Sequence, residues 1–287
     1  MDIPTGISII EKSFKAGQFL FIWSQKRTAR YLYVELQNGV DIANRIIALF
    51  EAHGVKRTQI YHFIGEEFPD VKPTITAEKL EQLIDKRLID FISELFGVRK
   101  EWIEGEKGPI YPALCFYKNL SGFVAFCHDI IERHPDEFCF FVVLKDARCS
   151  DDLYKSQPEI RLYFAEPMGA IGDTTIYRYH PVFGGLPWDH LPARYHLQAF
   201  FNIAERTRKL IVKGYNVPGI KLSNLSSGNL IPEYGYRIKL IWHPADYGFP
   251  DDKRVGKIPA YKWENFLEFF SERDEVGYLS ENYFDEP

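Results

Sequence analysis

The stretch Leu95–Glu106, LFGVRKEWIEGE, decides how the first third of the chain is interpreted. An apolar helical segment runs into it and reaches Gly97, a residue that often ends helices because it adopts the left-handed backbone without strain. A basic pair follows, and Trp102 and Ile103 then stand in a short turn that Gly105 closes. This layout predicts that the Trp102 indole covers the apolar side of the preceding helix.

Two helices are predicted upstream of this stretch. The segment 42–53 carries one apolar helical face, with Asp41 as its N-cap and Gly54 as a stop signal. A shorter helix is predicted over 57–64. Residues 1–40 are expected to form an N-terminal arm, either as a hairpin or as a single amphipathic helix.

A third apolar stripe begins beyond two prolines. Thr76 is its N-cap candidate, and the stripe continues to Phe96. No helix-breaking residue separates Ile84 from Leu88, so the stripe is either two helices or one continuous helix.

With the LFGVRKEW end included, these segments resemble the lambda-repressor-like (XRE-type) helix-turn-helix domain over about 65 residues. The resemblance implies helices one to five over 42–53, 57–64, 76–84, 87–96 and 100–104, with the third reading the DNA groove. It also implies double-stranded DNA as a partner. The donors expected nearest the groove are Lys56, Arg57, Gln59, Lys72, Thr74 and Lys79.

Charge and loop length count against DNA binding. The chain has a net charge of −5, and residues 41–107 hold ten Lys and Arg against thirteen Asp and Glu. Contacts to phosphates dominate DNA affinity and need cations. The gap Glu66–Thr74 is long and rich in proline, and the predicted third helix is acidic. A helical region that kept the fold and binds another partner therefore stays open as an alternative.

A second domain is predicted to begin after residue 107, where Gly108 and Pro109 precede a change of pattern. The fold class is α+β: a helix-turn-helix-like bundle over 1–107, then a mixed, mostly antiparallel sheet with flanking helices over 108–287. Strands are expected over 110–117, 137–145, 159–166, 174–181, 209–215 and 236–242, and helices over 120–133, 193–208 and 263–270. Residues 108–235 resemble the C-terminal part of bacterial proteins with such a helical region, which implies no known activity.

One aromatic and basic cluster in this domain could bind a small anionic or aromatic ligand. Its members share a strand end, a glycine-bearing loop and the helix that follows. They are Tyr177, Arg178, Tyr179, Trp188, His190, Arg194 and Tyr195. Because strand side chains alternate between faces, Tyr177 and Tyr179 point one way and Arg178 and His180 the other. We therefore expect at most one of these pairs to enter a pocket.

No catalytic or metal-binding motif is recognisable. The eight histidines show no metal-ligand spacing, and no phosphate-binding or nucleophile-elbow motif occurs. We predict no cofactor, no metal and no catalytic residue, although an enzyme with a site peculiar to the second domain stays open. The four cysteines stand in mostly apolar surroundings, which favours buried free thiols.

No apolar run approaches the roughly 18 residues of a membrane span, and no secretion signal is recognisable. We therefore expect a cytoplasmic protein of bacterial type. The leading hypothesis is a homodimeric DNA-binding transcriptional regulator whose C-terminal domain senses a ligand or mediates dimer contacts.

Overall fold

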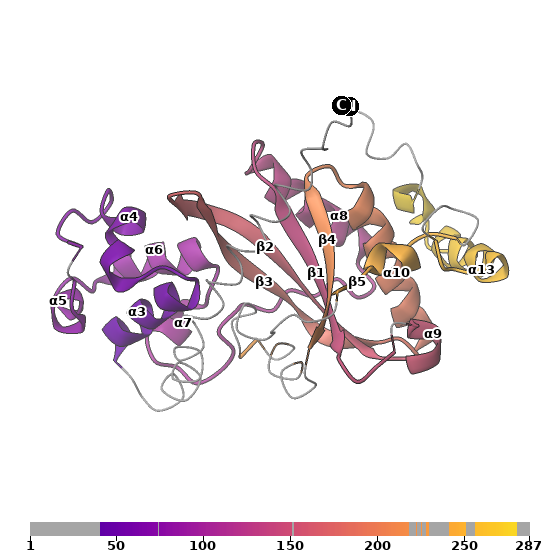
Figure 1. Cartoon of the computed structure of the whole chain (residues 1–287), viewed down its shortest axis with the longest axis horizontal. Coiled ribbons are helices and arrows are strands. Elements are labelled where there is room, and N and C mark those ends of the chain that lie inside the picture. The colour runs from indigo at the N-terminus through magenta and orange to yellow at the C-terminus, as the bar shows by residue number, and fades with distance from the viewer. Residues whose placement is uncertain are drawn as a thin grey trace, which may run out of the picture. The chain divides into compact units, whose positions relative to one another are not determined.

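The computed structural model describes residues 41–73, 75–150, 152–217, 222, 225, 228–229, 241–250 and 256–279. The arm predicted over 1–40 lies outside these residues. The chain divides into two compact units, the first ending at Ile84 and the second beginning at Asp85. Figure 1 labels helices and strands of both units. The domain boundary predicted after residue 107 falls inside the second unit.

The first unit contains α3 (Ile42–Ala52), η1 (Arg57–Gln59), α4 (Tyr61–Ile64) and α5 (Ala77–Glu81). Both predicted N-caps are confirmed. The Asp41 carboxylate accepts a hydrogen bond from the Asn44 amide at 2.8 Å, and the Thr76 hydroxyl accepts one from the Lys79 amide at 3.3 Å. Each cap satisfies a backbone N–H that the helix itself leaves without a partner.

The apolar faces predicted for these helices form the core of the first unit. The α3 and α5 helices contact each other. Side chains that are at most 1% exposed come from three helices and the residue before α4, and include Ile46, Ile47, Leu49, Phe50, Ile60, Ile64 and Leu80. The α5 helix has only five residues, so it is shorter than the predicted segment 76–84.

The second unit begins with α6 (Lys86–Phe96) and α7 (Lys100–Ile103). Helices α5 and α6 are separate, so the alternative of one continuous helix from Thr76 to Phe96 is wrong. The reason is Asp85, whose extended backbone starts α6 and whose carboxylate accepts from the Leu88 amide at 2.8 Å. At the other end, Gly97 ends α6 in the left-handed conformation, with φ of 65°.

Trp102 is buried, as the sequence predicts, with 4% of its surface exposed. Helices α6 and α7 contact each other, and an ion pair of 2.7 Å joins Lys100 to Asp90. Helix α6 also contacts strand β3 (Thr174–Pro187), which groups it with the sheet. The sequence-based boundary missed this grouping because α6 contacts a strand that begins 78 residues beyond its last residue.

Among the described residues, the sheet has five strands in the order β3-β2-β1-β4-β5. Its other members are β1 (Cys139–Asp146), β2 (Glu159–Ile171), β4 (Leu210–Val217) and β5 (Ile241–Trp242). Only the β1–β4 pair is parallel. The prediction of an α+β protein with a mixed, mostly antiparallel sheet is therefore confirmed.

The remaining elements are α8 (Leu120–Glu132), α9 (Leu153–Ser156), α10 (Leu191–Arg206), η2 (Pro244–Tyr247), α13 (Ala260–Ser271) and η3 (Val276–Leu279). The strand predicted over 110–117 is wrong, because Leu114 alone pairs with Val182 there. Pro109 precedes this segment and Pro112 lies within it, and neither can donate to a ladder. None of the described helices is both long and apolar enough to cross a membrane.

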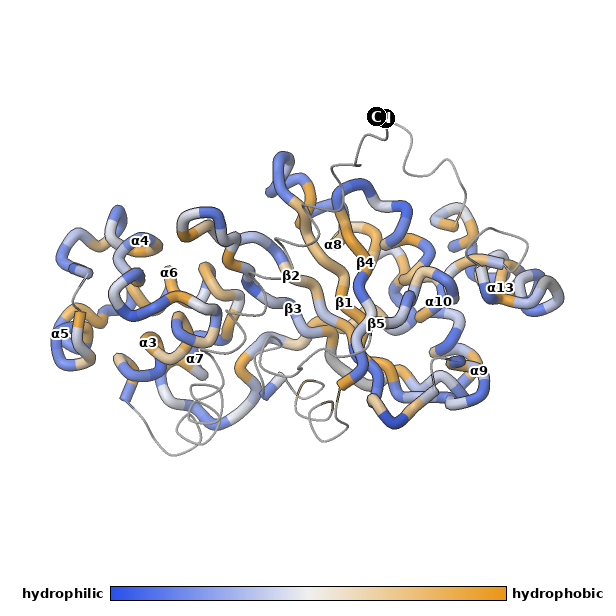
Figure 2. Tube along the Cα trace, in the orientation of Figure 1, coloured by the Kyte–Doolittle hydropathy of each residue, from blue (hydrophilic) through white to orange (hydrophobic). Residues whose placement is uncertain are grey.

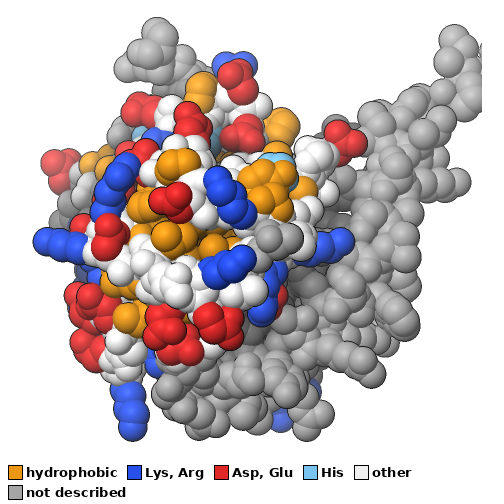
Figure 3. Space-filling model, turned by 90° about the vertical axis from the view of Figure 1, so that its left-hand side faces the viewer, with side chains coloured by type: hydrophobic (Ala, Val, Ile, Leu, Met, Phe, Trp, Pro, Cys, Tyr) orange, Lys and Arg blue, Asp and Glu red, His pale blue; other side chains and the backbone are white. Residues whose placement is uncertain are grey.

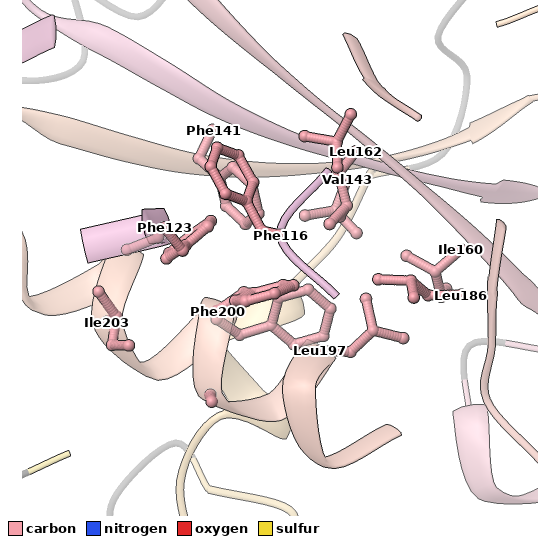
Figure 4. Packing of buried hydrophobic residues seen from close by; sticks show 14 of the residues in the cluster. Phe116, Phe123, Phe141, Val143, Ile160, Leu162, Leu186, Leu197, Phe200 and Ile203 are labelled. Atoms are coloured by element: carbon pink, nitrogen blue, oxygen red, sulfur yellow. The ribbon is translucent and has the colours of Figure 1, made fainter. Parts of the chain in front are cut away.

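One face of the sheet is covered by α8 and α10 (Figure 4). The Phe123 ring of α8 stacks on the Phe200 ring of α10 at 4.3 Å, and both belong to the cluster that includes Phe141 and Phe164 of the sheet. The opposite face also buries side chains, among them Leu144. Strand β1 is consequently apolar from Cys139 to Leu144 (Figure 2).

Replacing Trp102 with alanine tests the packing of α7. Trp102→Ala should lower the free energy of unfolding by about 3–5 kcal/mol, because a large buried side chain leaves a cavity. Urea unfolding followed by circular dichroism measures this change. Glu101→Ala is the matched control, since Glu101 is exposed in the same helix. Equal stabilities for both variants would show that Trp102 does not contribute to the core.

Candidate functional site

Glu166 is a buried carboxylate at a position where the strand pattern calls for an apolar side chain. Ile160, Leu162 and Phe164 precede it on the same face of β2 and are buried in the core. The Glu166 side chain is 0% exposed. Burying a charge in this way is costly unless the charge is paired and hydrogen-bonded.

Four side chains supply the pairing. The Glu166 Oε1 atom accepts from Arg133 Nε at 2.9 Å, from His134 Nε2 at 2.9 Å and from Arg178 Nη2 at 2.6 Å. The Oε2 atom accepts from Arg178 Nε at 2.8 Å and from His180 Nε2 at 2.6 Å. Because an ionised carboxylate only accepts, each histidine must carry its proton on Nε2. We call Glu166 and these four donors the Glu166 cluster.

The cluster joins two distant parts of the chain. Arg133 and His134 follow the last turn of α8, whereas Arg178 and His180 lie on β3, next to β2 in the sheet. The register places Arg178 directly opposite Glu166. Arg178 and His180 therefore share the face of Glu166, which confirms the alternation predicted for Tyr177–His180.

The electrostatics of the cluster favour a permanently ionised Glu166. Burial alone would raise the pKa of this carboxyl, but hydrogen bonds from His180, Arg178 and Arg133 outweigh burial and hold the pKa well below its usual range. A carboxylate whose lone pairs are all occupied neither takes up a proton near neutral pH nor reaches a substrate. These properties are those of a structural ion cluster, not of a general acid or base.

Arg178 extends the cluster to helix α6. Its Nη1 atom donates to the carbonyl oxygen of Glu94 at 2.9 Å. Gly97, at the end of α6, lies against His180: a Cβ atom there would stand 3.5 Å from the His180 ring. One guanidinium thus holds both the buried carboxylate and the last turn of α6.

A cavity of about 380 Å³ lies beside the cluster. Its lining combines the end of α6, the end of α8 and the β2–β3 ladder. The lining residues are Leu95, His134, Glu137, Pro167, Met168, Gly169 and Arg178. Polar groups from separate elements converge on a partly apolar hollow, which is the usual character of a small-ligand site.

A larger hollow of about 590 Å³ is lined by α6 and its N-cap alone, from Asp85 to Glu94. Five of its six lining residues are charged, with both signs along one helix face. It lacks the convergence of separate elements that the cavity beside Glu166 has. We therefore take the cavity beside the Glu166 cluster as the candidate functional site.

The residues predicted to bind a ligand do not form one site. Arg178 alone of them lines the cavity. Tyr177 packs on Phe140 at 5.3 Å, and Tyr179 packs on Tyr163 at 5.8 Å. Both tyrosines lie on the sheet face opposite to Glu166.

The remaining predicted ligand residues lie around the start of α10. The Arg194 guanidinium donates to the Trp188 carbonyl oxygen at 3.4 Å, and Trp188 is fully buried. Tyr195 packs against Phe269 of α13 at 5.0 Å. His190 is exposed, and its ring lies 6.5 Å from that of Tyr117.

The predicted DNA-binding residues lie in the first unit, except Thr74, which is outside the described residues. Lys56, Arg57, Lys72 and Lys79 are exposed, and Gln59 is partly exposed. Gln59 accepts a hydrogen bond from the Lys56 amide at 3.0 Å. Arg57 lies 3.6 Å from Glu51, and Lys72 donates to the Pro69 carbonyl oxygen.

The four cysteines differ in burial. Cys127 and Cys139 are buried free thiols, as predicted, whereas Cys115 is exposed and Cys149 partly exposed. Burial raises the pKa of Cys139 to about 12, which disfavours the thiolate. No group of three or more His, Cys, Asp or Glu side chains that could hold a metal ion occurs among the described residues.

The members of the Glu166 cluster that were not predicted from the sequence are Arg133, His134 and Glu166 itself. A charged residue at an inward position of an apolar strand is the signal that could have identified Glu166. Its partners could not be assigned, since Arg133 stands 33 positions away. Comparison of the chain with family models, with curated proteins and with solved structures gives no match.

Removing the Glu166 charge should destabilise the protein strongly. Glu166→Gln leaves Arg133 and Arg178 without their buried counter-charge, so the free energy of unfolding should fall by about 3 kcal/mol or more at pH 7. Glu132→Gln is the matched control, because Glu132 is an exposed carboxylate at the end of α8, next to Arg133. Chemical denaturation of the three proteins measures the difference.

The pH dependence of this difference has a defined sign. The folded-state pKa of Glu166 is depressed, so its stabilising contribution is complete above the unfolded pKa of about 4.3 and is lost as pH falls below it. The stability gap between wild type and Glu166→Gln should therefore narrow from pH 5 towards pH 3. A gap that stays constant would contradict an ionised, paired Glu166.

Proposed function

We propose that this protein is a DNA-binding regulator whose second unit responds to a small ligand in the cavity beside the Glu166 cluster. The observation that supports DNA binding best is the order and separation of five short helices. Helices α3, η1 with α4, α5, α6 and α7 follow the spans of the resembled helix-turn-helix domain. The helix that lies in the DNA groove must be separate from the helix that follows it, and α5 is separate from α6.

The cations for phosphate contacts are few. The first unit offers Lys56, Arg57, Lys72 and Lys79 as exposed donors. Exposed acids accompany them, including Glu78 and Glu81 on α5. Affinity should consequently be low for one protomer, and a homodimer would double the number of phosphate contacts.

The ligand response is proposed to pass through Arg178. This side chain lines the cavity, binds Glu166 and donates to the Glu94 carbonyl oxygen in the last turn of α6. A ligand that binds Arg178 competes with these contacts. The resemblance assigns α6 to the fourth helix of the DNA-binding domain, and this assignment is the basis for proposing that the ligand affects DNA binding.

A titration of fluorescent duplex DNA at low salt tests the proposal. The logarithm of the binding constant should fall linearly with the logarithm of the salt concentration. The slope should be about −2 to −4 per protomer, because each neutralised phosphate contributes roughly −0.9. Lys56→Glu combined with Arg57→Glu should abolish binding and leave the fold intact, since both residues are exposed.

The matched control is a second Lys-Arg pair at the start of a helix. Lys86→Glu combined with Arg87→Glu makes the same change of charge at α6, outside the expected groove face. This control should retain most of the binding. Failure of the intact protein to shift any duplex at about 50 mM salt, or equal losses in both double variants, would rule out the proposed DNA contact.

A second candidate function is a helical region that binds another protein and not DNA. The observation that favours it is the mixture of charges: on the face shown in Figure 3, Lys and Arg side chains are interspersed with Asp and Glu around apolar side chains. A continuous basic surface is the usual footprint of a DNA-binding protein. The same titration separates the two functions, because this candidate predicts no shift of duplex at low salt.

A further inference from the structure

Two cations from two different helices contact the Tyr154 ring. This ring belongs to α9, the short helix after β1. The Lys262 ammonium of α13 lies 4.0 Å from the ring centroid, and the Arg194 guanidinium of α10 lies 5.9 Å from it. Two positive charges are thus held against one aromatic ring.

Neither cation has a carboxylate within 4 Å among the described residues. The Arg194 guanidinium donates to the Trp188 carbonyl oxygen, and the Lys262 ammonium lies over the rings of Tyr154 and Tyr261. Neighbouring cations differ in this respect: Lys155 lies 3.2 Å from Asp152, and Lys257 lies 2.7 Å from Asp246. Arg194 and Lys262 are also partly buried, which makes their lack of a counter-ion more costly.

The Tyr154 ring is packed against the protein, whereas the Tyr261 ring is accessible to solvent. Tyr154 packs edge-on against the buried Trp188 at 5.6 Å, and its hydroxyl oxygen accepts from the Gln198 amide at 3.0 Å. Tyr261 is 65% exposed, and its ring centroid lies 5.8 Å from the Lys262 ammonium. Lys262 therefore contacts one fixed ring and one accessible ring.

We propose that Tyr154, Arg194, Tyr261 and Lys262 bind a small ligand that carries a phosphate or carboxylate group beside an aromatic ring. Charge-assisted hydrogen bonds to an anion would supply a counter-charge that the described residues do not give these cations. The exposed Tyr261 ring offers a surface on which an aromatic ring stacks. This site is distinct from the cavity beside Glu166 and does not depend on DNA binding.

The opposing interpretation is that the two cations only fasten α10 and α13 to α9. Cation–π contacts of this kind stabilise a fold by about 0.5–2 kcal/mol without any ligand. The two interpretations differ in what they predict for binding. A purely structural contact has no affinity for an anion, whereas the proposed site has one that depends on both cations.

Isothermal titration of the full chain with 1-naphthyl phosphate tests the proposal, with inorganic phosphate and 1-naphthol as the separated halves of the probe. The naphthyl phosphate should bind with a Kd below about 1 mM and at least tenfold more tightly than either half. Lys262→Gln and Arg194→Gln should each weaken binding by about tenfold or more, which is the loss of one hydrogen bond to a charged group. Lys262→Arg, which keeps the charge, should retain binding.

Lys155→Gln is the matched control, because Lys155 is the residue next to Tyr154 and already has a carboxylate partner. It should leave the affinity unchanged within about twofold, as expected for a surface ion pair. The melting temperature of each variant checks its fold. The proposal is overturned if naphthyl phosphate does not bind, if phosphate alone binds equally well, or if Lys155→Gln weakens binding as much as Lys262→Gln in folded proteins.

Discussion

The buried Glu166 carboxylate is the interaction on which the second unit most depends. Its two oxygens accept five hydrogen bonds from Arg133, His134, Arg178 and His180, and its side chain is fully buried. An unpaired charge at this depth would cost several kcal/mol. The fold therefore depends on keeping Arg133 and His134, after α8, and Arg178 and His180, on β3, within hydrogen-bond distance of Glu166. The Arg178 guanidinium also donates to the Glu94 carbonyl oxygen and so holds the last turn of α6.

Local signals in the sequence predict the helices well. Asp41 and Thr76 cap α3 and α5 because their side chains accept from amides three residues ahead. The separation of α5 from α6 could have been predicted in the same way, since Asp85 caps α6 by accepting from the Leu88 amide. The lack of a proline or glycine between Ile84 and Leu88 does not exclude a break in the helix, because an N-cap residue such as Asp85 starts a new helix without either.

The candidate site could be predicted only in part. Strand alternation places Arg178 and His180 on one face, and the structure confirms this arrangement. The same rule does not reveal that Arg178 faces a carboxylate on β2, which depends on a register shift between Pro167 and Gly169. Trp188 and Arg194 are close to Arg178 in the chain, yet they belong to the surroundings of Tyr154.

Arg178 links the cavity beside Glu166 to helix α6, and the proposed ligand response depends on this link. Hydrogen exchange of the α6 amides in Arg178→Lys tests it most directly, because lysine keeps the charge beside Glu166 but cannot reach the Glu94 carbonyl oxygen at the same time. We expect faster exchange in the last turn of α6, with protection retained in β1 and β2. Unchanged exchange along α6 in the folded variant would contradict the link.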